Sequence, residues 1–157
     1  MSASRKKVQE DLFFEDVEIG RVFRTPAHTI TDEDIQAFCD LTFDHHPLHT
    51  DDAFARSMGF SKRIAHGLYG LALAEGLKTK LRLYEHTSIA SLGWDKVRFH
   101  QAVLSGDRVE VAMAFQSKRT ASRPDRGVVI EAVRLERGKG ELLISAEHAT
   151  MLKRREI

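Results

Sequence analysis

The chain has 157 residues, a length that fits one domain rather than two. It carries 24 basic residues (Lys and Arg) against 23 acidic ones (Asp and Glu), so it lacks the basic excess that is typical of nucleic-acid-binding proteins. Its one cysteine, Cys39, cannot form an intrachain disulfide, and nothing in the chain indicates an oxidising compartment.

Residues 1–11 are polar and show no periodic apolar face, which predicts a flexible N-terminal segment before a single domain over residues 12–157. No apolar stretch follows Arg5-Lys6-Lys7 as it would in a signal peptide. No stretch approaches the roughly 18 uncharged apolar residues that a membrane helix needs. We therefore expect a soluble, cytoplasmic protein.

The first regular elements are a strand and a helix. Val22 and Phe23 begin a predicted strand that runs toward Ile30. Thr31 and Asp34 have the spacing of a capping box, which predicts that a helix begins here. Cys39 falls on the apolar face of that helix, so we expect a small buried hydrophobic residue rather than a nucleophile.

A proline separates this helix from the next helical signals. Pro47 cannot lie inside a helix, so residues 43–50 are predicted to form a connection. Asp51 or Asp52 is expected to cap a short helix through Arg56. The longest helical signal runs from about His66 to Leu83, with leucines repeating at four-residue spacing.

The hydrophobic period changes after the long helix. Apolar and polar residues alternate over 108–115, and two further strands are expected over 128–135 and 142–152, joined by a glycine-rich turn. The chain thus predicts one long helix followed by three or four antiparallel strands. This is an α+β domain, consistent with a hotdog fold in which the sheet wraps around a central helix.

Asp44 and His49 are the residues from which we first infer chemistry. Asp44 ends a predicted helix and His49 follows the Pro47 turn, which can fold the chain back so that both side chains face one pocket. The ordinary pKa of histidine lies near neutrality. Beside a carboxylate, an imidazole can hold a water molecule and accept its proton as the water attacks.

Gly67 provides a complementary donor at the start of the long helix. Its backbone N–H has no intrahelical partner and lies at the positive end of the helix dipole. It can donate to an oxygen that gains negative charge, and the missing side chain would let a thioester carbonyl approach. Addition of water to an enoyl thioester needs a base, an acid and such a donor, and the chain offers a candidate for each.

The run from Asp44 to His49 resembles the hydratase motif of the MaoC-like acyl-CoA hydratases, also called (R)-specific enoyl-CoA hydratases. Asp44, Pro47, Leu48, His49 and Asp51 match that motif. Further segments resemble the family in the same order, so that the resemblance extends from about Phe14 to Leu152: Phe54-Ala55, Phe60, Ile64-Ala65-His66-Gly67, Arg98-Phe99, Val103 and Gly106-Asp107.

The resemblance implies a hotdog subunit, a homodimer and an acyl-CoA substrate bound between subunits, with no separate cofactor; a larger assembly of dimers is the alternative. It also implies catalysis by Asp44 and His49, with the Gly67 N–H polarising the thioester carbonyl. His46 stands where the family has an asparagine that orients the pair, and Glu75 stands where several relatives have a small polar residue. Together with His66, these two are possible pocket residues.

Several alternatives compete with these interpretations. The histidines at 45, 46, 49 and 66 could suggest a metal, but no carboxylate or cysteine set completes a shell, so we expect none. Glu75 could instead be an exposed acid that pairs with Lys78 or Thr79 one turn on. The basic residues Lys118, Arg119, Arg123 and Arg126 are typical of a solvated strand end, although they could meet the phosphates of CoA.

Two other functions fit parts of this pattern. A hotdog thioesterase would use Glu75 to activate water against the thioester carbonyl and would release free thiol. A non-catalytic acyl-CoA-binding or regulatory subunit would bind ligand without turnover. The acyl chain itself stays open among straight, branched and carboxylated groups.

Overall fold

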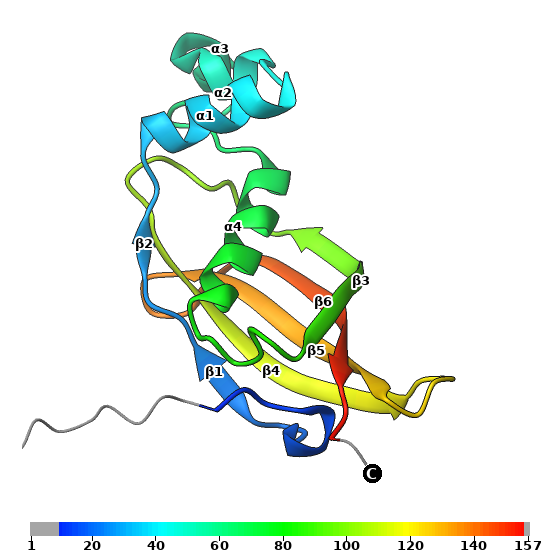
Figure 1. The fold of residues 1–157 in the computed structure, drawn as a ribbon. Coiled ribbons are helices and arrows are strands. Elements are labelled where there is room, and N and C mark those ends of the chain that lie inside the picture. Colours follow the sequence, from blue (N-terminus) through cyan, green and yellow to red (C-terminus); the bar gives the residue numbers. More distant parts are fainter. Residues whose placement is uncertain (1–9, 156–157) are drawn as a thin grey trace, which may run out of the picture.

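The computed structural model describes residues 10–155 and has the predicted α+β organisation (Figure 1). Its elements, in chain order, are η1 (Phe14–Asp16), β1 (Val22–Arg24), β2 (His28–Thr29), α1 (Asp32–Thr42), α2 (Pro47–Thr50), α3 (Asp52–Ser57), α4 (Gly67–Thr79), β3 (Ser88–Phe99), β4 (Arg108–Thr120), β5 (Arg126–Arg137) and β6 (Glu141–Lys153).

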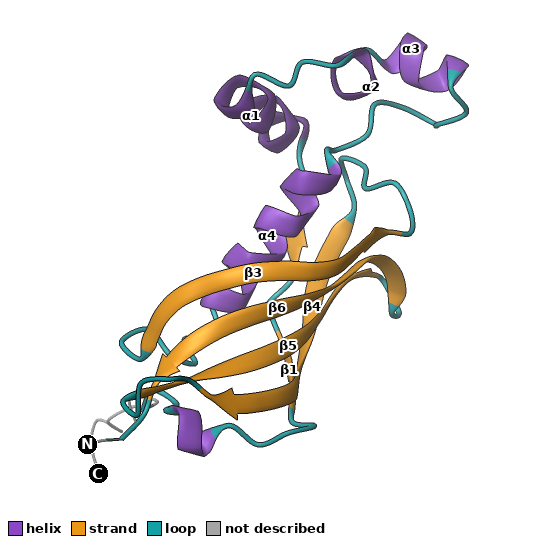
Figure 2. Ribbon diagram, turned by 90° about the vertical axis from the view of Figure 1, so that its right-hand side faces the viewer, coloured by secondary structure: helices purple, strands orange, loops and turns teal. Residues whose placement is uncertain are grey.

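The strands form one antiparallel sheet that curves around α4. Its order is β1-β4-β5-β6-β3, and the short β2 also pairs with β4. The helix lies against β4, β5 and β6, so the central strands carry most of the buried face. The three shorter helices gather beyond one end of the sheet, near the N-terminus of α4 (Figures 1 and 2).

The helix caps behave as the sequence predicts. The Thr31 side chain accepts the Asp34 N–H at 3.1 Å, and Asp34 accepts the Thr31 N–H at 3.0 Å, so the capping box is formed. Asp51 caps α3 by accepting two backbone N–H groups, those of Ala53 and Phe54. These bonds satisfy donors that a helix start otherwise leaves unpaired, and they fix where α1 and α3 begin.

Two prolines modify the predicted elements. The strand expected over residues 22–30 is divided into β1 and β2, with Pro26, which has no N–H to give to the ladder, between them. The connection expected over residues 43–50 contains the one-turn helix α2, with Pro47 at its first position. A proline is tolerated there because that N–H would have no helical partner in any case.

The strand β3 has no counterpart among the elements predicted individually from the sequence. It is an edge strand, and its pairing with β6 shifts register between Ser88 and Ala90, between Ser91 and Gly93, and between Asp95 and Arg98. These irregularities break the alternation of apolar and polar residues by which a strand is recognised. Apolar side chains along β3 stay exposed, namely Ile89, Leu92 and Phe99.

The core lies between α4 and the concave face of the sheet. It contains Leu77 of α4 and many buried residues of β4, β5 and β6. Cys39 is fully buried, as predicted for a small hydrophobic residue. Burial and the nearby carboxylates of Asp40 and Asp44 raise the pKa of its thiol, which keeps it in the unreactive protonated form.

The predicted N-terminal segment falls largely outside the described part of the chain, since residues 1–9 are not described. Asp11, at its end, is attached to the domain, because its carboxylate accepts the His86 N–H at 2.7 Å. Within residues 10–155 no helix has the length and apolar character needed to cross a membrane.

Candidate active site

A cavity of about 560 Å³ opens where α1, α2 and the N-terminus of α4 meet. Asp44, His49, His66 and Gly67 all line it, so residues predicted from separate segments are brought to one place. The remaining wall is mostly apolar, and several of its members were not among the site residues that the sequence predicts: Phe38, Phe60, Ile64, Leu68, Phe99, Val103 and Ile144.

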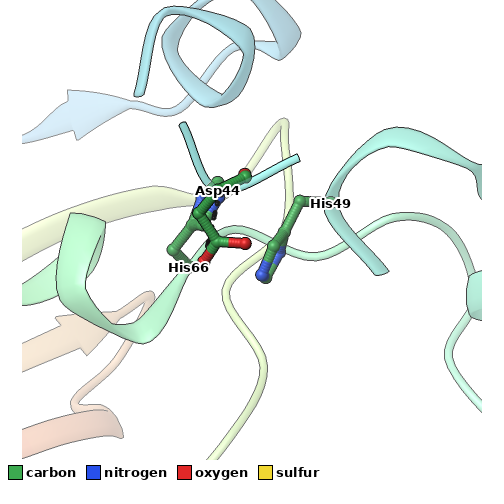
Figure 3. A group of neighbouring side chains, drawn as sticks. All are labelled: Asp44, His49 and His66. Carbon is green, nitrogen blue, oxygen red and sulfur yellow. Dashed lines mark hydrogen bonds and ion pairs between the residues drawn. The ribbon is translucent and has the colours of Figure 1, made fainter. Parts of the chain in front are cut away.

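Asp44 is positioned by the turn that ends α1. The preceding residue, Phe43, caps α1 in a left-handed conformation (φ 66°), which directs the chain away from the helix axis. The Asp44 side chain is 53% exposed, and its Oδ1 accepts the His46 N–H at 3.3 Å. The carboxylate therefore stays within reach of solvent and points toward His49 (Figure 3).

His49 is held by a hydrogen bond that fixes its tautomer. Its Nδ1 lies 2.7 Å from the Ile64 carbonyl oxygen, and a carbonyl can only accept, so Nδ1 carries the hydrogen. Nε2 is then left with a free lone pair. Burial lowers the pKa of the His49 imidazole, more than its bond to Ile64 raises it. The ring is thus a neutral base at pH 7.

The segments that carry His49 and His66 are joined by reciprocal bonds. The Ile64 N–H donates to the Leu48 carbonyl at 2.9 Å, while the Ile64 carbonyl accepts from His49.

His46 does not line the cavity; instead its Nδ1 accepts the Leu48 N–H at 3.2 Å and caps α2. It thereby helps to orient the turn that carries His49, by capping a backbone donor.

His66 lies beneath the pair and touches both of its members. It is 3% exposed, and its Nε2 lies 2.9 Å from the backbone carbonyl oxygen of Asp44. Its ring stacks on that of His49, with centroids 3.6 Å apart and an interplanar angle of 26° (Figure 3). His66 is therefore a buried support of the cavity rather than a polar group free to meet a ligand.

Gly67 is the first residue of α4, directly after His66. A side chain here would be crowded, because an added Cβ would lie 2.7 Å from the ring of Phe99. Close packing against Phe99 is thus a second reason for a glycine at this position, beside the predicted one, which is access of a ligand to the N–H. That N–H lies at the helix start, where no intrahelical acceptor exists.

One atom from each of Asp44, His49 and His66 lies within 4.8 Å of the others, a grouping that could suggest a metal site. A metal bound by two imidazoles must lie close to the plane of both rings. The two rings are stacked face to face, with centroids 3.6 Å apart and planes inclined by 26°, so their ring nitrogens do not point at one common position between them. His66 Nε2 also bonds to the Asp44 carbonyl. The geometry suits a hydrogen-bonding role and not metal ligation.

Of the two arrangements expected for Glu75, a possible pocket residue or an exposed acid paired one turn on, the structure has the second. Glu75 does not line the cavity; it borders a separate hollow of about 110 Å³ near the other end of α4. Its carboxylate pairs with Lys78 at 2.9 Å, which was the alternative interpretation. The helix is long enough to carry a residue two turns from Gly67 out of the site.

The basic cluster is largely engaged elsewhere. Lys118 donates to the carbonyls of Phe14 and Val17, and Asp125 pairs with both Arg123 and Arg126. The β4–β5 hairpin that carries these residues lies at the opposite end of the sheet from α1–α3 (Figure 1). It is distant from the cavity and fits a solvated strand end.

A family model described as "MaoC like domain" matches residues 15–134, more than half of the chain. The chain belongs to the MaoC-like family. A Mycobacterium tuberculosis protein described as a double hotdog fold superposes with a TM-score of 0.80 at 22% identity, over 92% of this chain and 44% of that one. The predicted hotdog fold is thereby confirmed.

Two further comparisons reach higher identity. The solved structure of a monoamine oxidase regulatory protein from Archaeoglobus is 31% identical, with a TM-score of 0.86 over 93% of this chain and 97% of that one. An (R)-specific enoyl-CoA hydratase of Aeromonas caviae is 31% identical over 76% of this chain and 84% of its own length. The matches to other curated relatives span less of their length: 31% of Protein MaoC of Klebsiella aerogenes and 54% of a 3-hydroxyacyl-thioester dehydratase Z of Mycobacterium tuberculosis.

Proposed function

We propose that this chain catalyses the reversible hydration of a 2-enoyl-CoA to a 3-hydroxyacyl-CoA. The observation that carries the proposal is the fixed tautomer of His49. Its Nδ1–H is committed to the Ile64 carbonyl, so Nε2 is free to accept a proton beside the Asp44 carboxylate. The family and the named relatives support a hydratase or dehydratase reaction of an acyl thioester.

The separation of Asp44 and His49 suits one shared water molecule. A water that makes hydrogen bonds of about 2.8 Å to two groups at a near-tetrahedral angle holds them roughly 4.6–4.9 Å apart. The ligating atoms of the pair lie within 4.8 Å of each other. In the proposed reaction, His49 Nε2 accepts the proton of a water that Asp44 orients, and the water oxygen bonds to C3.

Gly67 acts at the other end of the enoyl group. As the water adds, electrons move from the C2–C3 double bond to the thioester oxygen, and the Gly67 N–H stabilises the charge that develops there. The pair then delivers a proton to C2, so that one water is added and no charge is gained or lost. The helix start is suited to this because its dipole adds a positive potential.

The cavity wall supports an uncharged acyl group. Among the described residues that line it, none is a lysine or arginine that could pair with a carboxylated acyl chain. Phenylalanine, leucine and isoleucine side chains form most of the surface away from the pair. We therefore favour straight or branched apolar enoyl groups over carboxylated ones.

The test is a panel of enoyl-CoA substrates in which loss of the conjugated ultraviolet absorbance is followed. Hydration should be fastest with uncharged chains and absent in the Asp44→Asn variant. Release of free thiol, measured in the same reactions, would instead support a thioesterase. Binding of acyl-CoA without either signal would support a non-catalytic acyl-CoA-binding subunit.

We also propose that the chain forms a homodimer. The edge strand β3 leaves backbone groups and the apolar side chains of Ile89, Leu92 and Phe99 exposed, and Phe99 continues into the cavity wall. A second copy paired along this edge would cover these groups and close the cavity. Light scattering should give twice the chain mass at micromolar concentrations, and a persistent monomer would contradict the proposal.

A further inference from the structure

His66 is the buried polar residue of the cavity to which the proposed reaction assigns no step. Four side chains or backbone groups surround it: the rings of Phe38 and His49, the thiol of Cys39 and the carbonyl of Asp44. It also directly precedes Gly67. A single buried side chain therefore adjoins all three candidate catalytic groups.

The hydrogen bond to Asp44 fixes the state of the His66 ring. The Asp44 carbonyl can only accept, so His66 Nε2 carries the hydrogen of the 2.9 Å bond. Nδ1 is buried and has no hydrogen-bond partner among the described residues. Nε2 is thus the ring nitrogen through which His66 acts on Asp44.

This bond controls the direction of Asp44. The chain leaves α1 through Phe43 in a left-handed conformation, so Asp44 lies beyond the last residue of the helix. The carbonyl of Asp44 is captured by His66, while its side chain accepts from His46. Two bonds on different sides thus hold the residue that carries the candidate carboxylate.

The ring stack controls the tilt of His49. One hydrogen bond at Nδ1 fixes a point of the ring but still permits rotation about that point. The face of His66, 3.6 Å away, removes this freedom and sets the direction of the Nε2 lone pair.

We propose that His66 is a positioning residue that aligns Asp44 and His49 on one water, through its hydrogen bond to the Asp44 carbonyl and its stack on the His49 ring. The inference rests on the proposed hydration reaction. His66 contacts neither water nor acyl group in it; it acts through the pair. Its loss should therefore lower kcat far more than it raises KM.

Two variants separate the two contacts. His66→Phe retains a ring that can stack on His49 but cannot donate to Asp44, and His66→Gln retains a donor but has no ring. Each should lower kcat by on the order of 10²-fold, as for a small misplacement of reacting groups, with KM changed only a few-fold. Cys39→Ala is the matched control, because it removes another buried contact of His66, at 3.6 Å, and should leave kcat within a few-fold.

The pH dependence gives a readout that a merely structural role would not move. Among the charged and titratable groups near His49, His66 and His46 lower its pKa and Asp44 raises it. Replacement of His66 by phenylalanine should shift the acid limb of kcat/KM upward. In the His49→Ala background, His66→Phe should have little further effect on kcat, because its route of action is already lost.

Nuclear magnetic resonance of the His49 ring nitrogens keeps this test separate from that of the proposed function. A pKa of His49 that rises in His66→Phe, in wild-type protein that hydrates enoyl-CoA, would support the proposal. The same rise in a protein without hydratase activity would overturn the proposed function while retaining the positioning role. An unchanged His49 titration with kcat within two-fold of wild type would overturn the inference.

Discussion

Two clusters of histidine and carboxylate side chains lie near opposite ends of α4, and their difference shows what makes such a cluster reactive. The open cluster consists of Asp44, His49 and His66 at the helix N-terminus. The sealed cluster consists of Lys78, Glu131 and His148 near the C-terminus, and all three are at least 94% buried, with exposures of 6%, 0% and 2%. Both combine an imidazole with a carboxylate, yet only the first borders the large cavity.

The sealed cluster even contains the line of contacts found in serine hydrolases. Ser91 Oγ lies 2.7 Å from His148 Nε2, and His148 Nδ1 lies 3.1 Å from Glu131. Lys78 changes what this line can do. Its ammonium pairs with Glu75 and Glu131 and also lies 3.0 Å from His148 Nδ1.

His148 Nδ1 faces both the Lys78 ammonium, which can only donate, and the Glu131 carboxylate, which can only accept. Nδ1 is therefore enclosed by a buried ion pair rather than bonded to one fixed partner. In the open cluster the carbonyl of Ile64 is the partner of His49 Nδ1 and imposes one tautomer, which leaves Nε2 basic. The identity of the Nδ1 partner, and not the set of residues, separates a base from a structural group.

The largest effect is expected from the open cluster. Asp44→Ala and His49→Ala should each lower kcat roughly 10²–10⁴-fold, as for positioned acid–base groups, with the melting temperature nearly unchanged. The double variant should be little worse than the poorer single one, because both residues act on one water in one transition state. Glu75→Gln is the matched carboxylate control, since Glu75 lies outside the cavity.

Full multiplication of the two losses would mean that Asp44 and His49 act independently. Complete inactivation by Glu75→Gln, with Asp44→Asn still active, would mean that Glu75 and not Asp44 is the catalytic carboxylate. Steady-state rates for the five variants, normalised to folded protein by circular dichroism, check both outcomes.

The sealed cluster should respond in stability instead. Lys78→Met leaves the carboxylate of Glu131 buried without its cation, which should lower the free energy of unfolding by about 3–5 kcal/mol. In Lys78→Met/Glu131→Gln the unpaired charge is removed, so much of that loss should be recovered. Urea denaturation measures both variants, and a loss below about 1 kcal/mol in the single variant would contradict the role of the ion pair.

Substitution of Gly67 tests how much additional volume the packing beside the open cluster tolerates. Gly67→Ala would bring a Cβ to 2.7 Å from the Phe99 ring, an overpacking that should cost about 1–3 kcal/mol and displace the cavity wall. Adding Phe99→Leu should restore stability and part of the hydratase rate. If stability returns but the rate does not, the rate was lost because the alanine methyl group blocks access of the thioester to the N–H, and not because the Phe99 ring was displaced.

The smallest effect concerns pH. Burial lowers the pKa of His49, so its base form persists through neutrality and kcat/KM should fall only as pH drops through that lowered pKa, below about 6.5. The sign for stability is the same. An unfolded chain binds a proton at His49 near pH 6.5 whereas the folded chain does not, so stability also falls on acidification. An acid limb above pH 7 in wild-type protein would contradict this assignment.

The open cluster could be predicted from sequence because its residues lie within two short segments. Asp44, His49 and Gly67 are close along the chain, and Pro47 shows where the first segment turns. The tautomer of His49 could not be predicted, since it depends on a carbonyl 15 residues away. His46 is predicted as a possible pocket residue, yet it lies outside the cavity lining and caps α2 instead.

The sealed cluster could not be predicted because its residues are even farther apart in the sequence. Lys78 and Glu131 lie on α4 and β5, and His148 lies 70 residues from Lys78. Such partners meet only through the register of the sheet. Because these partners could not be predicted, nothing in the sequence decided whether Glu75 lines the cavity or pairs with Lys78 outside it. The strand β3 was missed because its bulges hide the period that revealed β4, β5 and β6.

The bulges of β3 also affect how readily the monomer aggregates through its exposed edge. A long, straight edge with exposed apolar side chains is a template for indefinite growth into fibrils. In β3 the three register shifts, and Lys96 with a φ of 51°, interrupt the row of backbone donors and acceptors and increase the local twist. A foreign strand cannot follow this contour over its whole length, so the exposed edge resists the open-ended aggregation that its hydrophobic side chains would otherwise promote.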